Sequence, residues 1–146
     1  MRIQDPEFRE RFLGALEEHP EFEAEARWFD GSILIVVGEE MTWLKIYRGK
    51  VIDILDFPPV FGYTFKLSGS VAAWEMLGTG ERTFTDLISA GSRHVETIAE
   101  IEAGGGYRPP EIAIEGNGVE AGRMHIATMH LARAFARTAV ASGVPA

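Results

Sequence analysis

The sequence predicts an α+β fold, with helices toward both ends of the chain and strands in its middle. Three observations predict it. Apolar residues recur at helical spacing before residue 30, form short runs or alternate between residues 32 and 67, and fill a long alanine-rich segment near the end. The chain has 146 residues, of which 46% are hydrophobic. That length and composition suit a single domain, residues 1–146, with its own core.

Two helices are predicted at the start of the chain. Asp5 is suited to the N-cap position and Pro6 to the first helical position. Apolar residues then recur at helical spacing from Phe8 to Leu16. The segment Glu21–Phe29 alternates as a strand does, but the preceding proline and its glutamate and alanine content favour a helix, which we expect.

Four strands are predicted next. Ser32–Val37 is apolar on both faces, which is typical of a central strand. Thr42–Arg48 and Val51–Leu55 follow after short glycine-containing turns, so the three predict an antiparallel meander. The two prolines in Asp56–Gly62 predict a loop. Strand four is expected over Tyr63–Leu67, with Tyr63, Phe65 and Leu67 on one side.

Three further helices are expected between strands four and five. Ser70 is suited to be the N-cap of the first, and Gly78 and Gly80 are expected to terminate it. The segments Thr83–Ala90 and Ser92–Ala103 have the pattern of two more helices.

The last third of the chain predicts a strand followed by one long helix. Glu111–Glu115 is the fifth strand, and a Gly-Asn-Gly break separates it from a helix over Val119–Ala141. About 23 residues at 1.5 Å each give roughly 35 Å, enough to cross the molecule. Its apolar positions lie on two faces, so it needs two apolar partners. The sheet is one, and a ligand cavity, another helix or a second subunit is the other.

Charge and composition exclude several classes of function. The 22 acidic and 14 basic residues give a formal charge of −8, which argues against nucleic acid and anionic membranes as partners. The absence of cysteine excludes disulfides and thiolate zinc sites. Met1–Glu10 is polar, so we expect no signal peptide, and no apolar run approaches the ~20 residues of a membrane span. We therefore expect a cytoplasmic protein without stable membrane insertion.

The sequence shows no catalytic or metal-binding constellation, so we expect no enzyme, metal or cofactor. His125 and His130 would point some 140° apart on a helix, which does not suit one metal ion. Asp53 is the best candidate for an acid or base because it interrupts an apolar strand. The alternative is an edge strand, where an exposed charge blocks further pairing.

With these elements placed, the chain resembles the sterol carrier protein 2 (SCP-2) family of small lipid-binding domains. The resemblance spans roughly Trp28 to Phe135. Tyr63–Leu77 (YTFKLSGSVAAWEML) looks like the family's strand, serine-containing turn and following helix. Ile112–Asn117 (IAIEGN) looks like its fifth strand. The segment Ala90–Pro110 is longer than the family's usual connection, which puts the shape of the tunnel mouth in question.

The resemblance implies a five-stranded, mainly antiparallel sheet covered by helices, with a long C-terminal helix. It also implies an apolar tunnel for fatty acyl chains, acyl-CoA or sterol-like lipids. On this interpretation the candidate ligand-binding residues come from strand four, the helices that follow it and the last helix. They are Tyr63, Phe65, Leu67, Trp74, Leu77, Leu87, Met124, Thr128, Met129, Leu131 and Phe135.

Each candidate also has a purely structural interpretation. Met124, Met129 and Phe135 can line a pocket or simply fill the core. Trp74 can cap a tunnel or be a core residue with a satisfied N–H group. The aromatic loop Phe57–Phe61 (FPPVF) can be an apolar portal or pack onto the core.

The basic residues of the last helix leave a similar choice. Arg123, Arg133 and Arg137 can bind an acidic head group, but their spacing covers more than one face. Pairing with nearby glutamates is the simpler interpretation.

Three functions follow from the sequence. The first is a non-catalytic carrier of apolar small molecules. The second is a small cofactor-free enzyme that uses Asp53 in the same pocket. The third is a homodimeric interaction module that uses the second apolar face of the last helix.

Overall fold

The computed structural model describes residues 1–89, 91–92, 98, 107–108 and 110–144. The helices of this part of the chain are α1 (Pro6–Glu17), α2 (Pro20–Ala26), α3 (Val71–Thr79), α4 (Phe84–Ile88), α6 (Gly118–Arg123) and α7 (His125–Ala141). The strands of the main sheet are β1 (Asp30–Val37), β2 (Glu40–Tyr47), β3 (Lys50–Leu55), β4 (Phe65–Gly69) and β7 (Ile112–Gly116). A separate short ribbon pairs β5 (Gly91–Ser92) with β6 (Tyr107–Arg108).

The main sheet has five strands in the order β3-β2-β1-β4-β7. Three neighbouring pairs are antiparallel, and β1 and β4 are parallel. The predicted meander and the mainly antiparallel α+β sheet are therefore confirmed. β1 is the central strand, as its two apolar faces predicted, and Ile33 lies opposite both Leu44 of β2 and Phe65 of β4.

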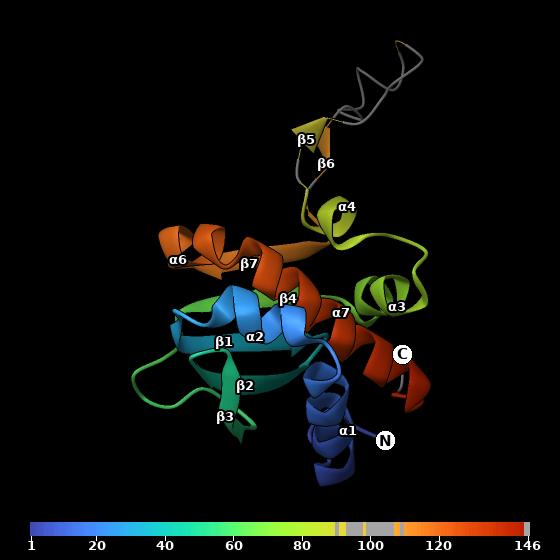
Figure 1. Ribbon diagram of the computed structural model, residues 1–146. Helices are drawn as coiled ribbons and strands as arrows, with labels where there is room; N and C mark the ends of the chain where they lie inside the picture. Colours follow the sequence, from blue (N-terminus) through green and yellow to red (C-terminus); the bar gives the residue numbers. More distant parts are fainter. Residues whose placement is uncertain (90, 93–97, 99–106, 109, 145–146) are drawn as a thin grey trace.

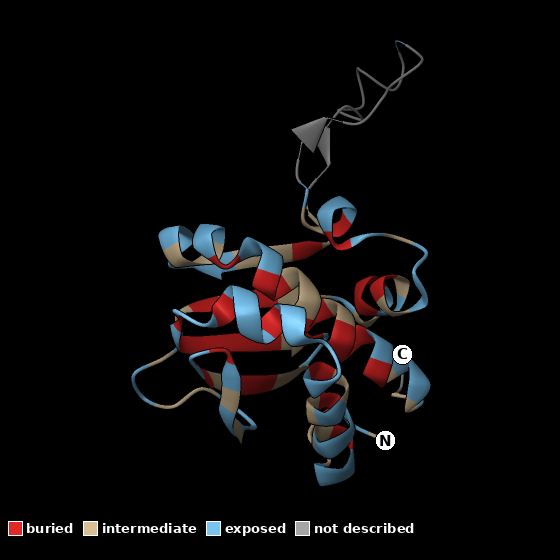
Figure 2. Cartoon of the chain, viewed as in Figure 1, coloured by how far each residue is buried: buried red, intermediate tan, exposed pale blue. Residues whose placement is uncertain are grey.

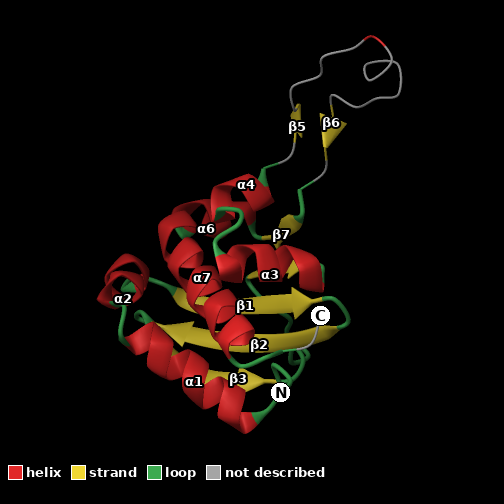
Figure 3. Ribbon diagram, turned by 90° about the vertical axis from the view of Figure 1, so that its right-hand side faces the viewer, coloured by secondary structure: helices red, strands yellow, loops and turns green. Residues whose placement is uncertain are grey.

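The helices cover one face of this sheet, as Figures 1 and 3 show from two directions. Helix α7 is central in the helical layer, where it contacts α1 and α2 on one side and α3 and α4 on the other. The inward residues of the sheet alternate along each strand, so Ile33 and Ile35 of β1 point into the core.

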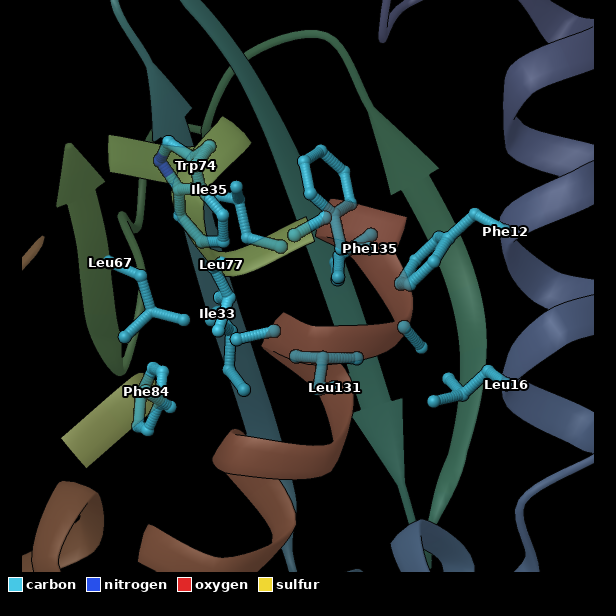
Figure 4. Packing of buried hydrophobic residues seen from close by; sticks show 14 of the residues in the cluster. Phe12, Leu16, Ile33, Ile35, Leu67, Trp74, Leu77, Phe84, Leu131 and Phe135 are labelled. Carbon is cyan, nitrogen blue, oxygen red and sulfur yellow. The ribbon is translucent and has the colours of Figure 1, made fainter. Parts of the chain in front are cut away.

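Phe135 of α7 joins three helices in the core. Its ring meets those of Phe8 and Phe12 of α1 edge-on, each at 5.2 Å between centroids, and that of Trp74 of α3 at 5.6 Å. Figure 4 shows Phe12, Trp74 and Phe135 in this arrangement, and Figure 2 shows buried residues along the inward sides of the helices and sheet. The aromatic contacts fix where α1 and α3 lie on α7.

The starts of α1 and α3 agree with the sequence in different ways. Asp5 is the N-cap residue of α1, but its carboxylate accepts a hydrogen bond from the Arg2 backbone N–H at 2.8 Å and makes no bond to the helix. The Ser70 hydroxyl caps α3 by accepting from the Ala73 backbone N–H at 3.1 Å. Gly80, with a φ of +82°, ends α3 in the left-handed region that glycine tolerates.

Gly78 does not terminate α3, contrary to the prediction. It lies within the helix where α3 crosses α7. A Cβ at this position would lie 2.5 Å from the Ala136 carbonyl oxygen and 2.6 Å from a methyl group of Val140. The residue therefore serves the close approach of two helices.

The prediction of one long last helix over Val119–Ala141 is also wrong, because the structure contains two helices there. α6 and α7 are separated at Met124, whose φ of −89° and ψ of 8° leave the helical region. Gly118 and Gly122 have low helix propensity and make the first segment weak. The 17 residues of α7 span about 25 Å instead of 35 Å.

Two other predictions need adjustment. Strand four begins at Phe65, two residues later than predicted, because the chain is still turning at Gly62, where φ is +80°. Tyr63 is thus outside the strand. Of the predicted helix Ser92–Ala103, Ser92 lies in β5, and most of the remainder lies outside the described residues.

Candidate functional site

An open cavity of about 530 Å³ lies between the end of α3, the start of α4 and the outer side of α7. Its size is in the range of small-molecule binding sites. The residues that line it are Leu77, Gly80, Arg82, Thr83, Phe84, Thr85, Met129, Arg133 and Arg137. We refer to it as the α3–α7 cavity.

One side of the α3–α7 cavity is apolar. Leu77 and Phe84 are buried core residues that also border the cavity, and Met129 of α7 is half-buried beside them. The Thr83 hydroxyl caps α4 by accepting from the Asp86 backbone N–H at 3.1 Å, which holds the adjoining Phe84 in place. This side can accept hydrocarbon without an unpaired polar group.

The other side of the α3–α7 cavity is cationic. Arg133 and Arg137 are four residues apart on α7, which is about one helical turn. Met129 lies four residues before Arg133, so all three side chains share one face of the helix. Arg82 reaches the same cavity from the α3–α4 connection and pairs with Glu111 at 3.1 Å. Neither Arg133 nor Arg137 has an ion-pair or hydrogen-bond partner within the described part of the chain.

A smaller cavity of about 160 Å³ adjoins the same two arginines. It is lined by His19, Glu21, His130, Arg133, Ala134 and Arg137. Arg133 and Arg137 thus separate two cavities, and the local charge on this side of α7 is positive although the chain is acidic overall. Such a surface attracts an anionic group.

Most of the residues predicted to bind a ligand lie in the core. The buried ones are Phe65, Leu67, Trp74, Leu77, Leu87, Met124, Thr128, Leu131 and Phe135. Leu77 and Met129 line the α3–α7 cavity. Tyr63 is 37% exposed and lies before β4. The Thr128 hydroxyl is buried and finds no partner in the described residues.

Trp74 has the satisfied N–H group that its structural interpretation required. Its indole Nε1 donates to the Val36 carbonyl oxygen at 2.9 Å, which ties α3 to β1. It also borders a separate pocket of about 260 Å³ between α3 and the end of α7. Trp74 is therefore fixed in the core, and only 2% of its surface is exposed.

Sequence reasoning missed Arg82 and Phe84 and did not choose Arg133 and Arg137. The spacing of Met129, Arg133 and Arg137 places all three on one helical face, and this signal was available in the sequence. Arg123, in contrast, behaves as the simpler interpretation expected. It lies on α6, pairs with Glu120 at 3.4 Å and stacks on Trp28.

The enzyme hypothesis loses the feature on which it depended. Asp53 is exposed on β3, an edge strand of the main sheet, and one of its carboxylate oxygens accepts from the Ile54 backbone N–H at 2.9 Å. The edge-strand interpretation of Asp53 is confirmed. No group of three or more metal-ligating side chains occurs in the described ranges. A search of the same residues finds no helix long and apolar enough to span a bilayer.

No protein-family model matches this chain, and no curated protein sequence matches it significantly. Solved structures do resemble it. The crystal structure of sterol carrier protein 2 has a TM-score of 0.58 at 12% identity, covering 90% of this chain and 94% of its own. A conserved hypothetical protein of Thermus thermophilus, possibly a sterol carrier protein, has a TM-score of 0.57 at 11% identity, covering 94% and 90%. The chain therefore has an SCP-2-like fold.

Proposed function

We propose that this protein is a non-catalytic carrier of apolar small molecules that have an acidic head group, such as fatty acids or acyl-CoA. The α3–α7 cavity carries the proposal, because it joins an apolar wall to two arginines that have no partner in the described residues. The similarity in fold to sterol carrier protein 2 supports it. We further propose a cytoplasmic location, which cell fractionation would test.

The energetics are adequate for such a ligand. Burying about 15 methylene groups at ~0.8 kcal/mol each gives on the order of 12 kcal/mol. Association costs at least several kcal/mol of that gain, which leaves micromolar affinity or somewhat better. A charge-assisted bond from Arg133 or Arg137 to a carboxylate would add orientation as well as affinity.

Met129 provides the test of this proposal. The substitution Met129→Asp places a carboxylate on the apolar wall, next to the expected hydrocarbon chain. We expect affinity for a fluorescent fatty acid to fall at least about tenfold, because hydrocarbon burial is lost and a charge is desolvated. Fluorescence titration measures the affinity.

Ile126→Asp is the matched control. Ile126 lies on the same helix, is 50% exposed and does not line the α3–α7 cavity, so this variant should bind as the parent protein does. Circular dichroism of both variants checks the fold. Equal affinities of Met129→Asp and the parent protein would refute the proposed cavity, and no fatty-acid binding by the parent protein would refute the carrier function.

A further inference from the structure

The segment between β3 and β4 concentrates the exposed apolar surface of the molecule. Of the large apolar side chains exposed in the described part of the chain, a third lie on this segment, namely Phe57, Val60, Phe61 and Tyr63. Val60 is 107% exposed, Phe61 80% and Phe57 68%. Figure 1 shows this segment projecting beyond the sheet, away from both chain ends, and Figure 2 shows its exposure. We call Phe57, Val60 and Phe61 the loop tip.

The backbone of the segment holds the loop tip outward. The Gly62 N–H donates to the Pro59 carbonyl oxygen at 2.9 Å and closes a turn with Val60 and Phe61 at its centre. Central turn positions usually have small or polar residues, since they face solvent. Here the most exposed positions of the turn instead hold a valine and a phenylalanine.

The base of the segment is anchored to the body of the protein. Asp56 forms an ion pair with Arg9 of α1. On the other side of the turn, the Thr64 N–H donates to the Ser32 carbonyl oxygen at 3.0 Å. Within the tip, the Phe61 ring meets the Trp43 ring of β2 at 6.1 Å and is still 80% exposed. The apolar tip is thus presented on a fixed base.

Charge and area decide which partner this surface fits. Residues 57–63 contain no charged side chain, and the chain has a formal charge of −8, so an anionic surface would repel it. The loop tip exposes on the order of 400 Å². Pairing two copies through it would bury about 800 Å², less than the roughly 1,200 Å² of a stable protein interface. A projecting, uncharged apolar tip is better suited to enter a deformable apolar layer than to form a protein–protein interface.

We propose that the loop tip docks the protein reversibly onto zwitterionic lipid bilayers. Phe57, Val60 and Phe61 enter the boundary between head groups and acyl chains, where aromatic rings are favoured. Since no charge at the tip contributes, binding is insensitive to salt and is not strengthened by anionic lipid. This docking does not depend on a ligand in the α3–α7 cavity.

Sedimentation with phosphatidylcholine vesicles, in the absence of any added fatty acid, tests the proposal. The parent protein should co-sediment, and Val60→Asp should bind at least about tenfold more weakly, because a charge at the tip must be desolvated. Val119→Asp is the matched control, since Val119 is a 71% exposed valine on α6, and it should bind as the parent does. Phe57→Ser, a second tip variant, should also weaken binding.

Several outcomes would overturn the proposal. They are no co-sedimentation of the parent protein, unchanged binding of both tip variants, equal losses in Val60→Asp and Val119→Asp, or stronger binding when phosphatidylserine is added. Self-association without vesicles that Val60→Asp abolishes would assign the loop tip to a second copy instead. Fatty-acid affinity of Val60→Asp should equal that of the parent protein. The experiment therefore distinguishes failure of the docking proposal from failure of the proposed carrier function.

Discussion

Arg133 and Arg137 differ from the other arginines that the structure describes. Most of the others pair with carboxylates, as Arg82 does with Glu111 and Arg123 with Glu120. In a chain with 22 acidic residues, these two neighbouring cations remain unpaired within the described residues, although Glu21 lines the smaller cavity beside them. An external anion accounts for this arrangement better than protein stability does.

Replacing both residues, as Arg133→Gln with Arg137→Gln, tests this role. We expect affinity for a fatty acid to fall about tenfold or more, since hydrogen bonds to charged groups contribute about 1.5–3 kcal/mol. Affinity for the fatty alcohol of equal length should not change, because its uncharged hydroxyl group makes no ion pair with these arginines. Isothermal titration of both ligands gives the comparison.

A control variant separates head-group binding from net charge. Arg27→Gln with Arg48→Gln removes the same charge from exposed positions that do not line the α3–α7 cavity. It should leave both affinities unchanged. If acid and alcohol lose affinity equally in the Arg133 and Arg137 variant, these arginines shape the cavity and do not bind the head group.

The sequence predicted the apolar part of the cavity better than its cationic part. Leu77 and Met129 were among the ligand-binding candidates that the resemblance to the SCP-2 family implied. Arg82 lies on the α3–α4 connection and Phe84 begins α4, and only the packing of α3 and α4 against α7 brings them beside Met129. Periodicity within one element contains no information about that crossing.

At the scale of elements, the crossing of α3 and α7 depends on Gly78. Since a Cβ would meet the backbone of Ala136 at 2.5 Å, Gly78→Ala must push the helices apart. We expect this substitution to lower the free energy of unfolding by about 1–3 kcal/mol, although alanine is the better helix former. Urea denaturation measures it.

Gly14→Ala in α1 makes the same change without the clash. Nothing lies within 4 Å of a Cβ there, so we expect stabilisation by roughly 0.5–1 kcal/mol from helix propensity. Opposite signs for the two variants would establish the close approach at Gly78. Stabilisation in both would contradict it.

The elements themselves were largely predictable, and their ends were less so. Strands β1, β2 and β3 occur where alternation and turn residues predicted them. The break at Met124 was missed because no proline or C-terminal glycine marks it. Gly78 was predicted to terminate the helix, because sequence alone does not distinguish a glycine that ends a helix from one that allows another helix to pack closely.

At the scale of the whole molecule, the two apolar faces of α7 already have partners. One packs on the sheet, and α1, α2 and α3 cover much of the rest. Of the exposed apolar residues on α7, Ile126 and Val140 are 14 positions apart, roughly 21 Å along the helix. They do not form one continuous surface for a second copy.

We therefore predict a monomer. Light scattering at tens of micromolar should give a mass close to 16.1 kDa, because neither α7 nor the loop tip offers the area of a stable dimer. A mass twice as large would restore the interaction-module hypothesis. Ile126→Asp and Val60→Asp would then locate the interface, since the first alters α7 and the second the loop tip. If the protein is a monomer and binds fatty acid, one copy of the chain is sufficient for the proposed carrier function.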